Sequence, residues 1–187
     1  MEKLFVGIDI SKDKFDVSYT KDGQNTFGHS TFLNSKSGIK KFFSKAIKIL
    51  EKENFKQLHF CMEATGIYHC ELCEFLQESP VHIVSVITPL KTKAFSRSLL
   101  LRTKNDKVDS SMLALYGFLH NPPQTPKLPE TIKRFRNLVR YKETLTESRT
   151  QEIGRLKSSL DSEVKRLINK KILFIEKQTK EVISKIQ

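Results

Sequence analysis

Residues 4–11 of the chain read LFVGIDIS, an apolar run of strand-forming residues that contains one carboxylate, Asp9. The apolar residues follow one another without strict alternation, which predicts a strand that is covered on both faces. An isolated carboxylate is costly to desolvate in such a strand, so Asp9 needs a partner, and a cation is the most direct one. The alternative interpretation is that Asp9 lies at the strand end and caps the following turn.

Length and composition indicate a folded protein. The 187 residues are enough for one domain of ordinary size and an appendage, and 38% of them are hydrophobic, including 13 Phe and no Trp. The apolar runs are far shorter than the roughly 20 residues that a membrane-spanning helix needs. The first three residues lead directly into the strand and do not resemble a signal peptide. We therefore expect a cytoplasmic protein with no membrane partner.

The three cysteines, Cys61, Cys70 and Cys73, do not form the pattern of a disulfide framework. Cys70 and Cys73 beside His69 suggest a zinc site, but no second pair follows at the spacing of a zinc finger. We expect reduced structural thiols.

The net charge of +12 is concentrated in the second half of the chain. Residues 1–90 hold 11 Lys and 11 acidic residues, whereas residues 91–187 hold 22 Lys and Arg against 10 acidic residues. This segregation favours a polyanion as the partner of the C-terminal part, most simply nucleic acid. A basic coiled coil that binds acidic proteins is the alternative.

The order of the predicted elements indicates a mixed α/β sheet of five strands. A turn after residue 11 and the alternation over residues 14–20 predict a hairpin, and residues 27–33 supply a third strand. A helix from residue 36, a strand over residues 58–63, a helix over residues 68–77, a strand over residues 81–87 and a helix from Pro89 follow. Crossover connections place the later strands parallel to the first, so Asp9 and Glu63 would lie at the carboxyl ends of parallel strands.

Two further carboxylates, Asp106 and Asp109, stand at the start of an apolar helical segment over residues 112–119. Their spacing of three residues lets one helix face present both. The alternative is that they only favour the positive end of the helix dipole.

The C-terminal part reads as helical. Residues 122–129 are rich in proline and predict a linker. Residues 130 to about 169 contain no proline and carry apolar residues at helical spacing, which predicts a helix of about 60 Å. Such a helix needs a partner, either the helical segment 172–187 or another copy of the chain. The pattern reaches residue 187 with no stop signal, which is typical of a chain that has been cut.

Four carboxylates that converge on one sheet edge would repel one another unless a divalent cation balanced them. Oxygen ligands favour Mg²⁺ or Mn²⁺, and two such ions about 4 Å apart can activate a nucleophile and stabilise the leaving oxygen of a phosphodiester. Together with the basic second half, this predicts phosphoryl transfer on nucleic acid.

Three motifs in this order resemble the signatures of the DEDD transposases of bacterial insertion sequences: residues 6–12 (VGIDISK), 62–68 (MEATGIY) and 104–110 (KNDKVDS). This is the insertion-sequence one-ten family, which includes the pilin-gene-inverting recombinases. Residues 138–149, which begin LVRYK, are similar to the start of the family's coiled coil. The resemblance covers essentially the whole chain. Each motif is weak alone, and the three together are specific.

The resemblance implies a fold and a site. Residues 1–121 would form a RuvC-like, RNase H-type catalytic domain, residues 122–129 a linker and residues 130–187 a helical coiled-coil arm. The catalytic and metal-binding residues would be Asp9, Glu63, Asp106 and Asp109, with Mg²⁺ or Mn²⁺ as the cofactor. Asn105 and Ser110 stand where the family usually has Thr and Ala, and both changes leave the carboxylates in place.

The resemblance also implies an activity and partners. The protein would cleave and exchange DNA strands to mobilise an insertion sequence in the bacterial nucleoid, guided by a noncoding RNA from its own element. The arm would mediate a homodimer or a higher homo-oligomer. Family members carry a further C-terminal domain whose serine attacks DNA, and none follows Gln187. We therefore expect this chain to bind metal and nucleic acid without completing strand exchange alone.

The candidate nucleic-acid contacts are basic residues in two groups. One group is close in sequence to the proposed site, and the other lies on the arm: Lys91, Lys93, Arg97, Arg102 and Lys104, and Arg134, Arg136, Arg140, Arg149 and Arg155.

Three other functions are compatible with parts of the sequence. A stand-alone RuvC-like nuclease, such as a junction resolvase, would carry a similar set of carboxylates, but the long basic arm favours the transposase. An actin-like sugar kinase needs a second phosphate-binding hairpin, which the sequence does not contain. A non-catalytic nucleic-acid-binding coiled-coil module would use the four carboxylates only to cap helices and turns.

Overall fold

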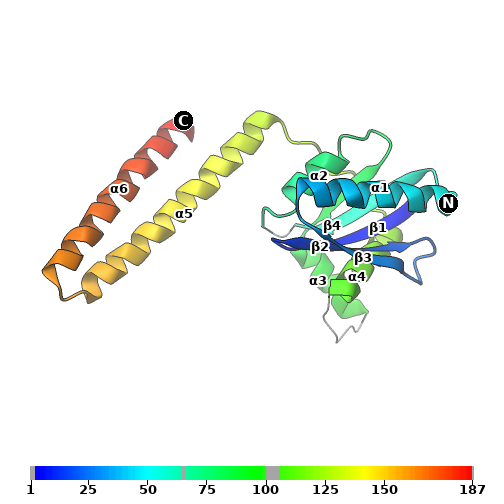
Figure 1. The fold of residues 1–187 in the computed structure, drawn as a ribbon, viewed down its shortest axis with the longest axis horizontal. Helices are drawn as coiled ribbons and strands as arrows, with labels where there is room; N and C mark the ends of the chain where they lie inside the picture. The colour runs from blue at the N-terminus through cyan, green and yellow to red at the C-terminus, as the bar shows by residue number, and fades with distance from the viewer. Residues whose placement is uncertain (1–2, 65, 100–105, 187) are drawn as a thin grey trace. The chain divides into compact units, whose positions relative to one another are not determined.

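The computed structural model describes residues 3–64, 66–99 and 106–186 and divides the chain into two compact units, Met1–Lys127 and Leu128–Gln187 (Figure 1). Within these described ranges, no helix is both long and apolar enough to cross a membrane. Each unit is described by itself below.

The first unit is built on a five-stranded mixed sheet. Its strands are β1 (Lys3–Ile10), β2 (Lys14–Thr20), β3 (Phe27–Leu33), β4 (Gln57–Glu63) and β5 (Ile83–Ile87), in the order β3-β2-β1-β4-β5. The pairs β1–β2 and β2–β3 are antiparallel, whereas β1–β4 and β4–β5 are parallel. The predicted mixed sheet is therefore confirmed, including the initial hairpin, in which Ser11 closes the turn by donating from Oγ to the carbonyl of Lys14 at 2.8 Å.

Helices cover both faces of this sheet. Figure 1 shows α1 (Lys36–Lys52) and α2 (Cys70–Leu76) on one face, and α3 (Pro89–Ser98) and α4 (Asp106–His120) on the other. Side chains alternate along a strand, so even-numbered residues of β1 enter the core under α1, whereas Phe5, Gly7 and Asp9 face α4. The same alternation turns Asp16 of β2 and Glu63 of β4 toward α4.

The core under α1 is the larger of the two in this unit. Its strand residues pack against Ile39, Phe42 and Ala46 of α1, and the Phe42 ring lies edge-on to Phe15 and Phe60 at 5.4 and 5.9 Å. Helix α1 begins where the sequence predicts, with Ser35 as the N-cap that accepts from the amide of Gly38. A smaller core under α4 contains Cys61, Ile87, Met112, Leu113 and Tyr116.

Glycines lie at the contact between helix α4 and the sheet, one on β1 and one on α4 itself. A Cβ atom added at Gly7 of β1 would lie 2.0 Å from the carbonyl oxygen of Ser110 and 2.2 Å from the amide nitrogen of Ala114. A Cβ atom at Gly117 would lie 2.5 Å from the sulfur of Cys61. The backbone of α4 therefore rests directly on the backbone of β1.

The proline-rich segment 122–129, predicted to be a linker, packs in part against the sheet. Thr125 donates from its amide to the carbonyl of Val84 at 2.8 Å, and the amide of Val84 donates to Oε1 of Gln124 at 2.7 Å. These bonds cover the open edge of β5, which would otherwise expose unpaired backbone groups. Residues up to Lys127 belong to the first compact unit.

The second unit is a hairpin of two helices, α5 (Glu130–Ser158) and α6 (Ser162–Ile186). The predicted end of the first helix near residue 169 is wrong, because Ser159 adopts an extended backbone and Asp161 starts a new helix by accepting from the amide of Val164 at 2.8 Å. Serine and aspartate compete with helical hydrogen bonds and favour such boundaries. Of the two partners considered for this helix, the second helical segment packs against it.

Two kinds of contact join the helices of the arm: a small apolar cluster and an ion pair of a buried glutamate. Leu145 of α5 belongs to one buried cluster with Ile175 and Val182 of α6, and Leu138 and Ile186 pack against this cluster. Glu152 is 4% exposed and accepts from Arg155 at 2.5 Å and from Lys171 at 2.7 Å. The arm thus has a small core of its own.

Replacing Gly7 with alanine is expected to destabilise the first unit by about 1–3 kcal/mol, because the added methyl group would overlap the α4 backbone. Gly154→Ala is the matched control. Gly154 has nothing within 4 Å of an added Cβ and lies inside α5, so alanine there is expected to stabilise its helix by roughly 0.5–1 kcal/mol. Scanning calorimetry of the parent and both variants measures the effect. Equal unfolding temperatures for Gly7→Ala and the parent would contradict the close contact.

Candidate active site

Two carboxylates lie at the same edge of the sheet because β1 and β4 are parallel neighbours. Ile8 pairs with Met62 at the end of the β1–β4 ladder, and Asp9 and Glu63 are the next residues on each strand. Both are partly buried, and both point to the face that α4 covers.

The first turn of α4 brings Asp106 and Asp109 to this edge. Besides the contact at Gly7, buried hydroxyl groups fix the start of this helix on β2. The Oγ atoms of Ser18 and Ser110 lie 2.9 Å apart, and Ser111 donates to Ser18 at 3.2 Å. The predicted start of this helix at the two aspartates is confirmed.

The electrostatic environment of Asp9 shows that the carboxylates are close enough to interact. The pKa of Asp9 is raised from its ordinary 3.8 to about 6, first by burial and then by the charges of Asp109, Asp106, Glu63 and Asp16, in that order of size. The four residues singled out from the sequence therefore share one electrostatic environment.

Asp16 is a fifth acidic residue at this edge, and the sequence analysis missed it. It pairs directly with Asp9 across β1 and β2, is 3% exposed, and accepts at Oδ1 from Oγ1 of Thr31 at 2.5 Å. Nε2 of His29 lies 3.1 Å from the same oxygen. The register of the predicted hairpin could have revealed it, because the strand alternation puts Asp16 on the same face as Asp9.

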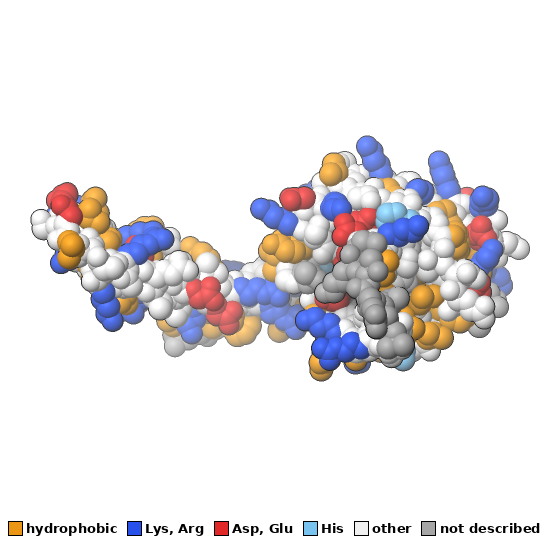
Figure 2. Space-filling model, turned by 90° about the horizontal axis from the view of Figure 1, so that it is seen from below, with side chains coloured by type: hydrophobic (Ala, Val, Ile, Leu, Met, Phe, Trp, Pro, Cys, Tyr) orange, Lys and Arg blue, Asp and Glu red, His pale blue; other side chains and the backbone are white. Residues whose placement is uncertain are grey.

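Lys14 provides a positive charge beside these groups. Its Nζ lies 2.5 Å from Oδ2 of Asp106 and 3.7 Å from Oδ2 of Asp16. The hydrogen bond and the charge of Lys14 lower the pKa of Asp106, whereas the same contact raises the pKa of Lys14. Figure 2 shows acidic side chains gathered on this face of the unit, next to histidine and basic side chains.

Glu63 is held by a residue of α3. Thr92, which is 1% exposed, donates from Oγ1 to Oε2 of Glu63 at 2.5 Å, and the carbonyl oxygen of Pro89 lies 3.0 Å from the same Oγ1. The predicted proline start of α3 places Thr92 one turn into the helix, where it orients the Glu63 carboxylate.

The side chains at this edge are suited to a divalent cation, since carboxylate oxygens are the ligands that Mg²⁺ and Mn²⁺ prefer. A bound cation would also neutralise the repulsion between the crowded carboxylates. In the part of the chain that the structure describes, however, no three His, Cys, Asp or Glu side chains already surround a single metal position. This holds at the acidic edge, where Lys14 contacts Asp106, and equally at His69, Cys70 and Cys73. Cys61, Cys70 and Cys73 form no disulfide bond with one another.

The candidate nucleic-acid residues fall on two helices. Lys91, Lys93 and Arg97 are exposed on α3, whereas Arg102 and Lys104 lie outside the described residues. The five candidate arginines of the arm are all exposed on α5, and two of these five form ion pairs within the hairpin: Arg149 with Glu176 at 2.8 Å and Arg155 with Glu152 at 2.5 Å.

The raised pKa of Asp9 predicts a stability that depends on pH in metal-free buffer. The folded chain holds the Asp9 proton more tightly than the unfolded chain, so the contribution of Asp9 to stability falls as pH rises from about 4 to about 6 and then levels off. Burial lowers the pKa of His59 to about 4, so His59 contributes in the opposite direction over this range, and the difference between the parent and an Asp9 variant isolates the Asp9 contribution. Asp9→Asn removes the charge and is expected to stabilise the chain at pH 7.5 by roughly 1 kcal/mol, a value reduced for solvent screening of a partly exposed group. Thermal unfolding of both proteins from pH 4 to 8 measures this difference. A parallel pH dependence in the two would contradict it.

Comparisons with known proteins identify the family. A sequence model of the DEDD transposases of the IS110 type, described as a transposase, matches residues 6–164. Pilin gene-inverting proteins of Moraxella bovis and Moraxella lacunata are each 36% identical over 157 residues, which are 81% of this chain and 47% of theirs. The chain thus spans about half the length of the curated relatives it matches. The solved structure of Thermus thermophilus RuvC aligns with a TM-score of 0.46 and 10% identity over 65% of this chain and 99% of that one. By the family model and the two relatives, the chain belongs to the IS110 family of DEDD transposases.

Proposed function

We propose that the first unit is the metal-dependent catalytic part of a DNA transposase, and that Asp9, Glu63, Asp106 and Asp109 hold Mg²⁺ or Mn²⁺. The observation that carries the proposal is the environment of Asp9, a half-buried carboxylate whose charge is opposed by carboxylates from β2, β4 and α4. Repulsion between these carboxylates reduces the free energy of unfolding. Carboxylates that served only to cap turns and helices would have no reason to lie so close together, whereas a metal site needs them to.

Each neighbouring residue has a defined part in this proposal. A bound divalent ion would supply the charge that activates the attacking oxygen and stabilises the leaving oxygen of a phosphodiester. Thr92 orients Glu63, and Thr31 and His29 hold Asp16 beside Asp9. Lys14 neutralises Asp106 and would release it when a metal is bound.

Basic residues beside this site would hold the DNA. Lys91, Lys93 and Arg97 are exposed on α3, the helix that also carries Thr92, so they would bind phosphates next to Glu63. Arg102 and Lys104 are included in this group only because they are close to it in sequence, since they lie outside the described residues. The substrate in this proposal is the DNA of an insertion sequence in the bacterial cytoplasm, and strand exchange also uses the serine that the family resemblance assigns to a further domain.

The arm would bind RNA and a second copy of the chain. The family resemblance implies a noncoding guide RNA, for which Arg134, Arg136 and Arg140 on α5 are available. Helix α6 exposes apolar side chains that its pairing with α5 leaves uncovered, which supports a homodimer or higher homo-oligomer: Val164 (45% exposed), Leu167 (54%) and Phe174 (59%).

Calorimetric titration of Mn²⁺ tests the proposed metal site. The parent is expected to bind the ion, and the double variant Asp9→Asn, Glu63→Gln is expected to lose at least about 100-fold in affinity, because it removes two ligands. The titration is repeated with a short DNA duplex present, so that a site completed by nucleic acid is also detected.

The matched control is Glu71→Gln, Glu78→Gln, which makes the same change in net charge. Glu71 lies on α2 and Glu78 just after it, on the opposite face of the sheet. This control should bind Mn²⁺ like the parent. Equal binding by the parent and the Asp9, Glu63 variant, or no binding by the parent with and without DNA, would contradict the proposed site.

A further inference from the structure

Helix α1 carries a strongly basic outer surface. It holds six lysines and a single acidic residue, Glu51, and all six lysines are exposed. We call them the lysine face: Lys36, Lys40, Lys41, Lys45, Lys48 and Lys52. The equal numbers of basic and acidic residues in residues 1–90 conceal this surface, because the acidic residues of that half lie largely elsewhere.

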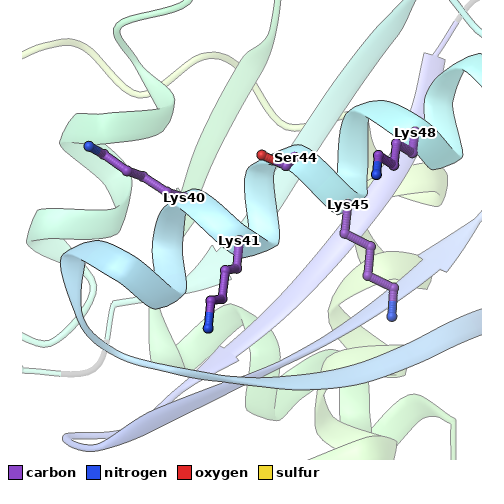
Figure 3. A pocket seen from close by; sticks show the side chains of 5 residues that line it. All are labelled: Lys40, Lys41, Ser44, Lys45 and Lys48. Atoms are coloured by element: carbon purple, nitrogen blue, oxygen red, sulfur yellow. The ribbon is translucent and has the colours of Figure 1, made fainter.

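The lysine face is separate from the carboxylate site. Ile39, Phe42, Ala46 and Leu50 of α1 are buried against one face of the sheet, and Asp9 and Glu63 point to the other. Lys40, Lys41, Lys45 and Lys48 line a shallow hollow of about 400 Å³ together with Ser44. Figure 3 shows these four lysines extending from the helix on either side of Ser44. A ligand bound here cannot reach the carboxylates through the sheet.

Folding does not explain this distribution of charge. Lys36 and Lys40, Lys41 and Lys45, and Lys48 and Lys52 are like charges four residues apart, which destabilise a helix. The first turn of α1 contains no acidic residue to balance the positive end of the helix dipole.

Ion pairs within the chain do not neutralise the positive charge of the lysine face either. Lys45 donates to Oγ of Ser30 at 2.5 Å and lies over the Phe32 ring at 5.9 Å. Among the described residues, no carboxylate lies within 4 Å of the ammonium groups of Lys40, Lys41 or Lys48. A solvated helix face usually mixes both signs of charge, so this one is suited to an external polyanion.

We propose that the lysine face binds the phosphate backbone of duplex DNA. The lysines extend over about 24 Å of helix, from the rise of 1.5 Å per residue, and a duplex presents one charge per about 1.7 Å. Lysine is a compact point charge that contacts phosphates without reading bases, so the binding is independent of sequence. No aromatic side chain of α1 is exposed, so the stacking platform that single strands need is missing from this helix. The choice of DNA over duplex RNA rests on the proposed function.

This surface gives the unit a second place to hold DNA. Because it faces away from the carboxylates, it would anchor a segment of duplex that is not being cleaved, either a distant part of the same molecule or a second molecule.

A substitution at Ser44 tests the lysine face without removing a lysine. Ser44→Glu adds a negative charge in the middle of the face and is expected to weaken binding of a 30-base-pair duplex roughly three- to tenfold, measured by fluorescence anisotropy in EDTA. It should not lower the unfolding temperature, because glutamate four residues before Lys48 is a favourable helix pair. The matched control, Ser44→Gln, should bind DNA like the parent.

A triple variant tests the same surface by charge removal. Lys40→Gln, Lys41→Gln, Lys48→Gln is expected to reduce the slope of log affinity against log salt by up to about 2.7, or about 0.9 for each phosphate that the variant no longer neutralises. Equal DNA binding by Ser44→Glu and Ser44→Gln, or a slope that the triple variant leaves unchanged, would overturn the proposal. The proposal would also be overturned if these variants lost affinity for duplex RNA but kept the affinity of the parent for duplex DNA.

Mn²⁺ titration of these variants separates this inference from the proposed function. The lysine-face variants should bind Mn²⁺ like the parent, since α1 lies on the other face of the sheet. If they keep both metal and DNA binding, the lysine face is wrong and the metal site stands. If Asp9→Asn, Glu63→Gln keeps Mn²⁺ while Ser44→Glu loses DNA, the metal site is wrong and the lysine face stands.

Discussion

The direct contact between the backbone of α4 and the backbone of β1 at Gly7 determines where the acidic residues lie. Any side chain at this position would overlap Ser110 and Ala114, so the helix could not approach the strand as closely. Since Asp106 and Asp109 occupy the first turn of that helix, this one contact brings them to the edge where Asp9 and Glu63 lie at the carboxyl ends of β1 and β4. The serine hydroxyls of Ser18 and Ser110 fix the same approach from β2.

The acidic edge that results is held together against electrostatic repulsion. Asp9 responds by a raised pKa, whereas Asp106 is stabilised in its charged form by Lys14. Hydrogen bonds from Thr31 and Thr92 orient the neighbouring carboxylates Asp16 and Glu63. Groups whose pKa values are shifted by burial and by neighbouring charges are concentrated at functional sites, although structural ion pairs also shift pKa values. On the opposite face, the lysines of α1 also bring like charges together at helical spacing, an arrangement that destabilises a helix.

Local patterns in the sequence predict most of the fold, and contacts between distant residues account for what they miss. Residues 4–11, the turn at Ser11 and the proline at position 89 specify local conformations, and the strands and helix starts that they predict are present. The break at Ser159 was missed because apolar spacing continues across it. Asp16 and the edge bonds of Thr125 depend on register and tertiary packing. The lysine face is also missed in the sequence, because residues 1–90 hold equal numbers of basic and acidic residues. The six lysines come together only when residues 36–52 form one helix.

Crystals of the parent bound to a short DNA duplex and soaked in Mn²⁺, with anomalous diffraction recorded at the manganese edge, test the central claim most directly. If Asp9, Glu63, Asp106 and Asp109 form one metal site, the strongest anomalous peak lies among their carboxylate oxygens, and the ammonium group of Lys14 has moved away from Asp106. A strongest peak at His69, Cys70 and Cys73, or a fully soaked crystal with no peak among the four carboxylates, would show that these acidic residues do not form a metal site.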